Sequence, residues 1–413
     1  MVLRGVFSGT QGAVVEWCDR RLLSRIHRYT LNRLRAEIEP VSPADFMRFL
    51  FAWQHVAPSS RLTGIDGLRA VLESLDGFEL AADAWERSVL PDRVDGYQFS
   101  MLDTLCLTGE AGWARLSSSA RDATQLVGAT PIALFLREHG DAWQQLRELD
   151  AEDPAEILAP ASRAVLDALR TRGASFVSDL IAACGLGETA VREALADLVS
   201  AGLVTSDGFG GLRTIVRGPG GRPAPTAARN VTGRWSIVNR EGQSAVSHED
   251  AVELQARALL RRYGVVFRRL LGREANAAPW RELTRVYRRL EARGEIGGGR
   301  FVTGMSGEQF ALADAITSLR EIRRTPPDGR CLVISGADPL NLAGIVTTGE
   351  RVRAVAGTRV AYRDGIPMAA LEGDYVRPLI AVTDVAPALA AEVATRLTGR
   401  PMPAVLSGFV GRS

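Results

Sequence analysis

The sequence contains no lysine: all 50 of its basic residues are arginine, against 48 acidic residues. P-loop ATPases, Schiff-base enzymes, protein kinases and Ser-Lys hydrolases each need a lysine in the site. Its absence excludes these chemistries for this chain. We attribute the bias to codon usage in a GC-rich genome and not to function.

Cysteine, histidine and long apolar runs are also scarce. The cysteines and histidines stand apart, without the spacing of a zinc site or a disulfide framework, so we expect no metal site and no cofactor on this chain. No run of eighteen apolar residues occurs, and the first residues lack the order of a signal peptide. We therefore expect a cytoplasmic protein, and 413 residues predict two to four domains.

Charge is divided along the chain. Residues 41–160 carry 9 Arg against 19 acidic residues, whereas residues 251–300 carry 12 Arg against 5 acidic residues. The net charge of +2 thus combines an acidic part and a basic part. A concentration of arginine is the pattern that attracts phosphate backbones.

Two segments have the order of a winged helix. In 160–217, three amphipathic helices precede a glycine-rich stretch around Gly208, Gly210 and Gly211, which predicts a hairpin wing. In 233–308, a helix over 249–271 and a second helix after Pro279 precede GEIGGGRFV, which predicts a two-strand wing. The sequence therefore predicts tandem winged helices.

The helix before the wing usually enters the major groove, so its exposed residues indicate whether the module binds DNA. In the first copy this helix is acidic, which favours a packing or partner role. In the second copy the apolar residues occupy one arc, and the opposite arc carries Arg281, Arg285, Arg288 and Arg289. We predict that these four bind DNA, the alternative being a solvated face paired with Glu282 and Glu291.

Aromatic residues offer a weaker DNA-binding signal. Trp17, Trp53, Trp235 and Trp280 could each stack on unpaired bases, although each also fits a core position; Trp235 stands in the exposed-looking GRWS after a Gly-, Pro- and Arg-rich linker. We single out Trp235 as a stacking candidate. The linker itself either only connects or also trails along phosphates.

The remainder predicts short helices at 43–56, 64–75 and 82–90, a helix over 309–324, and then short β-type runs with a last helix near 385–397. The fold class is thus α+β, mainly α: tandem winged-helix domains followed by a small antiparallel β-barrel or curved sheet. The predicted parts are a winged-helix remnant with an Arg-rich helix (1–40), a degenerate winged helix (41–159), a winged helix (160–217), a linker (218–232), an Arg-rich winged helix (233–308) and the β-rich end (309–413).

Several long stretches resemble a known family. VEWCDRRLLSRIHR, LLRRYGVVFRRLL, PWRELTRVYRRLEARGEIGGGRFVTGMSGEQFAL and SGADPLNLAGIV resemble the C-terminal part of bacterial large helicase-related proteins (Lhr). The resemblance implies an ATP-dependent DNA helicase whose RecA-like motor, with its ATP and Mg²⁺, lies in an N-terminal part not seen here. We therefore expect a fragment, a truncated product or one half of a split protein, whose partners are DNA and that motor.

The same region is similar to tandem winged-helix DNA glycosylases, which use a Gln-apolar-Gln or Gln-apolar-Asp motif. The matching residues are Ser74, Leu75 and Asp76, so the resemblance implies Asp76 as catalytic residue, although Ser74 departs from the motif. A carboxylate suits the cationic sugar of base excision. The alternative is that Asp76 and Gly77 only end a helix.

Three functions remain open at this point. The first is a DNA-binding accessory region of a helicase-related repair protein. The second is a DNA glycosylase acting through Asp76. The third is a winged-helix transcriptional regulator, which the β-rich end makes less attractive.

Overall fold

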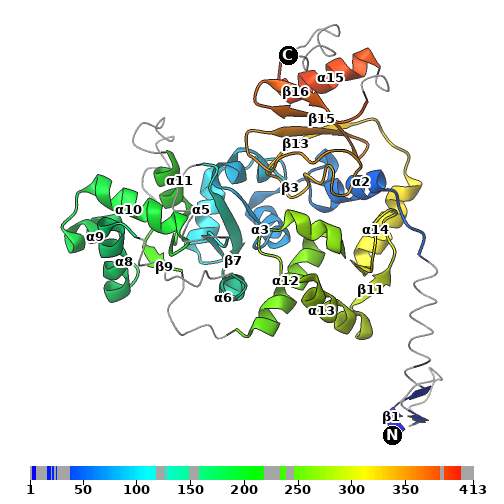
Figure 1. The fold of residues 1–413 in the computed structure, drawn as a ribbon, viewed down its shortest axis with the longest axis horizontal. Coiled ribbons are helices and arrows are strands. Elements are labelled where there is room, and N and C mark those ends of the chain that lie inside the picture. The colour runs from blue at the N-terminus through cyan, green and yellow to red at the C-terminus, as the bar shows by residue number, and fades with distance from the viewer. Residues whose placement is uncertain are drawn as a thin grey trace.

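The computed structural model describes residues 2–5, 16–19, 21–22, 25, 38–117, 126, 128–147, 158–217, 233–238, 246–381 and 386–400. These residues form winged helices and a separate C-terminal sheet, with α8 to α10 at one end of the body and the sheet on top (Figure 1). A short hairpin, β1 (Val2–Gly5) with β2 (Glu16–Asp19), precedes them. Most of the Arg-rich helix expected before residue 40 lies outside the described residues. Among the helices that are described, none is long and apolar enough to cross a membrane.

One hydrophobic core unites the Arg-rich winged helix with a helix from much earlier in the chain. Phe46 and Phe49 of this early helix are buried, and the Phe46 ring lies 5.8 Å from that of Phe267. The elements of this part are α2 (Pro43–Trp53), α12 (His248–Tyr263), β10 (Val265–Phe267), η6 (Arg268–Arg273), α13 (Trp280–Ala292), β11 (Ile296–Gly299), β12 (Gln309–Leu312) and α14 (Ala313–Arg324).

The wing of this winged helix differs from the expected hairpin. GEIGGGRFV supplies only β11, and its partner is β12, which also pairs with β10. The buried Gln309 explains the longer turn, because its Oε1 accepts the backbone N–H groups of Phe301 and Val302 at 2.8 Å each. The helix expected over 309–324 therefore begins only at Ala313.

A second core holds the segment from residue 58 to 145 together with the next winged helix. Its sheet has the order β4-β7-β6, and short helices pack on it. The elements are η1 (Pro58–Ser60), β3 (Leu62–Thr63), α3 (Gly64–Ser74), β4 (Glu79–Ala81), α4 (Ala82–Ala84), the π-helix η2 (Trp85–Val89), β5 (Val94–Asp95), α5 (Phe99–Leu107), β6 (Ala111–Ala114), β7 (Pro131–Leu136), η4 (Arg137–His139) and α6 (Gly140–Gln145).

The winged helix after it has the three expected helices but a different wing. The elements are α8 (Pro160–Arg172), α9 (Val177–Cys184), α10 (Glu188–Ser200), β8 (Val204–Ser206), α11 (Phe209–Arg217) and β9 (Trp235–Ile237). The prediction of a hairpin around Gly208, Gly210 and Gly211 is wrong, because Gly210 and Gly211 lie in α11. The second wing strand comes instead from beyond residues 218–232, where Trp235 pairs with Ser206.

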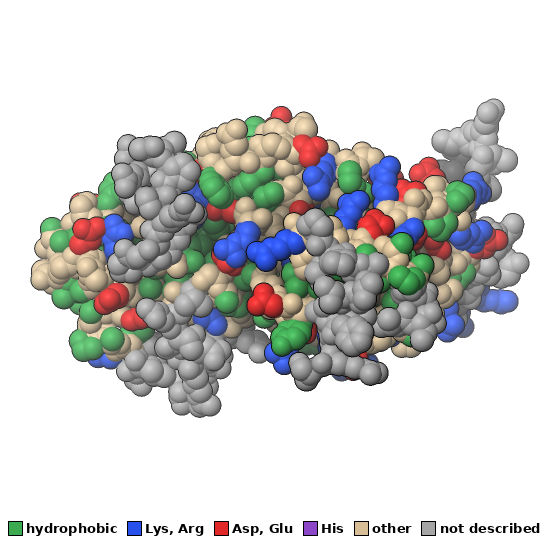
Figure 2. Space-filling view, turned by 90° about the horizontal axis from the view of Figure 1, so that it is seen from above, with side chains coloured by type: hydrophobic (Ala, Val, Ile, Leu, Met, Phe, Trp, Pro, Cys, Tyr) green, Lys and Arg blue, Asp and Glu red, His purple; other side chains and the backbone are tan. Residues whose placement is uncertain are grey.

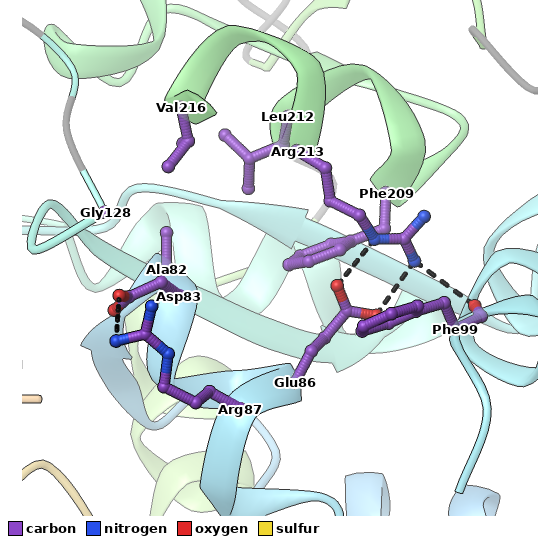
Figure 3. A pocket seen from close by; sticks show the side chains of 10 residues that line it. All are labelled: Ala82, Asp83, Glu86, Arg87, Phe99, Gly128, Phe209, Leu212, Arg213 and Val216. Atoms are coloured by element: carbon purple, nitrogen blue, oxygen red, sulfur yellow. Dashed lines mark hydrogen bonds and ion pairs between the residues drawn. The ribbon is translucent and has the colours of Figure 1, made fainter. Parts of the chain in front are cut away.

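Helix α11 forms because its apolar side and one arginine dock on the neighbouring winged helix. Phe209 and Leu212 are buried, and the Arg213 guanidinium binds the Glu86 carboxylate at 2.5 Å while lying over the rings of Phe99 and Phe209 (Figure 3). These residues line a cavity of about 450 Å³. Glycine has a low helix propensity, so these tertiary contacts stabilise a helix that the local sequence does not favour.

The C-terminal part is an antiparallel sheet covered by a helix: β13 (Cys331–Ser335), β14 (Arg359–Arg363), β15 (Ile366–Glu372), β16 (Tyr375–Pro378) and α15 (Pro387–Thr398). Its order β13-β14-β15-β16 leaves both outer strands unpaired with each other, so the described sheet is open. The antiparallel sheet is confirmed, whereas a closed barrel is not formed. Two of the short apolar runs that the sequence suggested as strands, GIVTT (344–348) and ERVRAVA (350–356), form no strand, and IPMAALE (366–372) supplies one that was not predicted.

Two buried arginines join these parts. Arg93 donates to both carboxylate oxygens of Asp338 at 2.7 and 2.9 Å and to Gln54 Oε1 at 2.9 Å. Arg262 donates to the backbone oxygen of Asp76 at 2.6 Å and forms an ion pair with Glu274. Buried hydrogen bonds and ion pairs of arginine therefore connect the segment from residue 58 to 145 with both the Arg-rich winged helix and the C-terminal part.

Candidate nucleic-acid interface

Helix α13 presents arginines on the side away from its core. Pro279 precedes its first turn, and Leu283, Val286, Tyr287 and Leu290 are buried. The side chains of Arg281, Arg285 and Arg288 are exposed on the opposite side. The arc predicted from helical spacing is thus present.

These arginines line a groove of about 680 Å³ between α13 and η6. We call it the arginine groove; its residues are Arg268, Trp280, Arg281, Thr284, Arg285, Arg288 and Glu308. Arg268, from η6, was not singled out from the sequence, although it lies in the same basic segment. Helix α13 lies at the bottom of Figure 1, whereas the opposite face in Figure 2 carries basic and acidic side chains intermixed among the described residues.

The four predicted arginines differ in their pairing. Within the described ranges, no carboxylate lies within ion-pair distance of Arg281 or Arg285, and the same holds for Arg268. Arg288 forms an ion pair with Glu308 at 2.7 Å at the rim of the groove.

Arg289 lies outside this set. Its guanidinium binds Glu249 and Glu253 of α12 at 2.6 Å each, and these hydrogen bonds raise the pKa of Arg289. The alternative pairing of this face with Glu282 is not seen, because the Glu282 carboxylate contacts His248 Nε2 at 2.8 Å. The predicted arginine face is thus partly neutralised and partly unpaired.

Trp235 does not lie where the sequence suggested. Its side chain is 1% exposed and meets Trp113 edge to face, with ring centroids 6.1 Å apart. The expectation of an exposed indole is wrong, because Trp235 lies on β9, which pairs with β8, and its side chain packs into the core. Trp280 is instead the tryptophan that borders the arginine groove.

Asp76 follows α3 and is fully buried. Its carboxylate accepts hydrogen bonds from Leu136 N at 3.0 Å, His139 Nδ1 at 2.6 Å and Trp143 Nε1 at 3.2 Å. The hydrogen bond to Asp76 raises the pKa of His139, whose side chain is 20% exposed. Helix α3 ends at Ser74 and Gly77 has a positive φ of 74°, so the turn given as the alternative is present, together with an Asp-His pair that sequence reasoning had not found.

Two family models match the chain, both described as a winged-helix domain of large helicase-related proteins. One, for the third such domain, matches residues 41–137, and the other, for the fourth, matches 245–331. The chain belongs to the large helicase-related (Lhr) family. Asp76 thus lies in the third Lhr winged helix, its partner His139 follows two residues after the matched range, and the arginine groove lies in the fourth.

Two curated Lhr proteins are similar over most of this chain. The "Lhr helicase/ probable uracil glycosylase" of Mycolicibacterium smegmatis is 32% identical over 405 residues, which cover 88% of this chain and 25% of that protein. The "Lhr helicase/uracil glycosylase" of Escherichia coli is 27% identical over 373 residues, which cover 79% of this chain and 23% of that protein. The chain spans about a quarter of the length of these relatives.

Proposed function

We propose that this Lhr region binds DNA through the arginine groove, as the DNA-binding part of a helicase-related DNA repair protein. The observation that carries the proposal is the set of three exposed arginines, from two elements of one winged helix, that no described carboxylate neutralises. In this proposal RecA-like motor domains, in the same or a separate polypeptide, supply the ATP- and Mg²⁺-dependent movement.

Guanidinium groups suit this task because each can bind a phosphate through two parallel hydrogen bonds. Arg268 from η6 and Arg281 and Arg285 from α13 approach the groove from two sides. Trp280 at its border can stack on a base. These contacts favour binding that depends on salt more than on sequence.

The salt dependence of DNA binding tests the proposal. Arg268, Arg281 and Arg285 are changed together to Ala, and the affinity for a duplex is measured over a range of NaCl concentrations. Each lost phosphate contact lowers the slope of log K against log salt by roughly 0.9, so the three together lower it by roughly 2 to 3.

The control removes the same charge elsewhere. Arg192, Arg330 and Arg396 are exposed, with side chains 42%, 61% and 55% accessible, and are changed together to Ala. If the slope of log K against log salt fell equally in both triple variants, the effect would come from net charge and not from the arginine groove. An unchanged slope in the groove variant would contradict the proposal, and selective binding to a palindrome would favour a regulator.

A second candidate, base excision, is favoured by the Asp76-His139 pair. In this proposal the C1′–N bond breaks, the base departs with the bonding electrons and takes a proton from His139. Water then adds to C1′ and returns a proton to His139. Asp76 has no exposed surface, so it acts as a positioning residue that favours the protonated ring.

Excision is tested on duplexes that contain uracil or alkylated bases, with abasic sites as the readout. Asp76→Asn should lower excision and shift the pH profile of the remaining activity, while circular dichroism reports whether it folds. His139→Gln, which changes a partly exposed side chain, should lose excision without unfolding. Absence of excision by the wild-type protein from every lesion would leave only the DNA-binding proposal.

A further inference from the structure

A cavity of about 550 Å³ lies where the third Lhr winged helix meets the fourth. Helix α3 contributes Glu73 and Ser74, α2 contributes Phe49 and Trp53, α12 contributes Arg261, and α14 forms the remaining wall. Arg261 also lies 3.8 Å from Asp76, measured from Nη2 to Oδ2. The cavity and the Asp76-His139 pair are therefore separated by one guanidinium.

The polar atoms around this cavity are incompletely bonded. Ser74 Oγ and the Nε and Nη2 atoms of Arg261 are buried, and none makes a hydrogen bond to any described residue. A buried donor without a partner destabilises the fold. These atoms have no accessible surface and do not face the cavity, whereas the Arg261 side chain as a whole is 31% accessible and lines it.

The same cavity has an aromatic wall. The rings of Phe49 and Trp53 lie 5.2 Å apart, and the Trp53 indole N–H is fixed by a 2.7 Å hydrogen bond to the backbone oxygen of Arg261. His55 also lines the cavity and has a left-handed backbone with φ of 62°, which is unusual for this residue type. Its Nδ1 lies 2.8 Å from the Ser60 carbonyl oxygen, so Nδ1 carries the proton and Nε2 is an acceptor in the neutral ring.

We propose that this cavity, the base cavity, receives a nucleobase extruded from DNA that is bound at the arginine groove. A nucleobase is flat, presents donors and acceptors on one edge, and is held in known extrusion sites by stacking and by hydrogen bonds to that edge. Trp53, which is partly exposed, supplies stacking, the partly exposed Arg261 side chain supplies donors, and Glu73 supplies an acceptor. The inference rests on the proposed DNA-binding function.

Glu73 takes the position expected of a contacting carboxylate. Its side chain is 48% exposed and lines the cavity, whereas that of Asp76, one turn later, is fully buried. Arg261 lies between them, at 4.0 Å from Glu73 and 3.8 Å from Asp76. We therefore assign Glu73 to contact with the base and Asp76 to positioning.

Photo-crosslinking tests where the base goes. The full chain is bound to a duplex with 5-iodouracil at a mismatch, irradiated, and digested for mass spectrometry. The expected crosslink lies on Trp53, the partly exposed ring of the cavity, because iodouracil reacts with the aromatic ring on which it stacks. Ala70, an exposed residue of α3 at the cavity, is changed to Trp to fill the space, and Ala183 of α9, equally exposed, is changed to Trp as control.

The base cavity is supported if Ala70→Trp loses the crosslink and keeps the affinity for DNA, while Ala183→Trp keeps both. Crosslinks that map elsewhere, or that survive Ala70→Trp, would overturn the inference and leave DNA binding intact. Failure of the wild-type chain to bind DNA at any salt concentration would instead overturn the proposed function, and the inference with it.

The polar edge has its own test. The affinity for a mismatched duplex relative to a matched one is compared for the wild type, Glu73→Gln, and Glu392→Gln, a control whose side chain is 45% exposed on α15. We expect about a tenfold loss of this preference in Glu73→Gln alone, the effect of about 1.4 kcal/mol. An unchanged preference would remove Glu73 from the site.

Discussion

Arg93 offers a sharp test of how the parts of the chain are joined. Its side chain is 1% exposed, and it donates two hydrogen bonds to Asp338, which is fully buried. Arg93→Met leaves the Asp338 carboxylate buried without its cation, a change that costs about 3–5 kcal/mol in other proteins. Replacing both residues, in Arg93→Met with Asp338→Leu, removes both charges and should recover most of that loss.

Urea unfolding followed by circular dichroism measures these differences, and the four proteins form a double-mutant cycle. Arg377→Met serves as a surface comparison, since Arg377 pairs with Glu372 at side-chain exposures of 32% and 34%, and it should cost less than about 1 kcal/mol. A loss in Arg93→Met no larger than in Arg377→Met would refute the reasoning. A double variant less stable than both single ones would refute it as well.

Three further outcomes follow from local geometry. The hydrogen bond to Asp76 raises the pKa of His139, so the protonated pair stabilises the fold below about pH 6.5. This stabilisation is lost as the pH rises through the raised pKa. Between pH 6 and 8, the free energy of unfolding should therefore fall more in the wild type than in His139→Gln. Burial and then the Asp338 carboxylate raise the pKa of Asp92 to about 6, so Asp92→Asn should be more stable at pH 8 by about 1–3 kcal/mol and equal at pH 4, as checked by urea titration. Gly365 has φ of 81° and a Cβ there would overlap a carbonyl oxygen of α2, so Gly365→Ala should lower the melting temperature.

Each of these has an outcome that contradicts it. Equal pH dependence of the unfolding free energy in wild type and His139→Gln would contradict the prediction for the histidine. The prediction for Asp92 would be contradicted if the difference in stability between Asp92→Asn and wild type were the same at pH 4 and pH 8. Gly373 is the control for Gly365, because it also has a positive φ of 64° but open space around its Cβ position. If Gly373→Ala costs as much, the backbone and not the overlap accounts for the loss.

Local periodicity predicted the helices well and the strands poorly. The apolar spacing places α8, α9 and α10 within the predicted winged helix, because a buried helical face needs no distant partner to be recognised. Strand β9 follows residues 218–232, so its pairing with β8 could not be inferred from neighbouring residues. The strand β15 was missed although Asp364 and Gly365, both with positive φ, form the two-residue turn that such a dipeptide favours.

The site shows the same division. The exposure of Arg281 and Arg285 follows from their position on α13, which sequence alone gives. The pairing of Arg289 does not, because its partners Glu249 and Glu253 stand 40 and 36 residues earlier on another helix. The base cavity could not be predicted from the sequence for a related reason. Glu73 and Arg261 are far apart in the sequence, and only the tertiary structure brings them together.

The buried Arg262 has a consequence for the DNA. This cation is 1% exposed; it donates to a backbone oxygen of the third winged helix and pairs with Glu274 of its own, so a hinge motion between the two would break the buried hydrogen bond to Asp76. The hydrogen bond therefore favours one relative placement of the two winged helices. In the proposed complex with DNA, a duplex that deforms at low energy would adapt to that placement more readily than a stiff one.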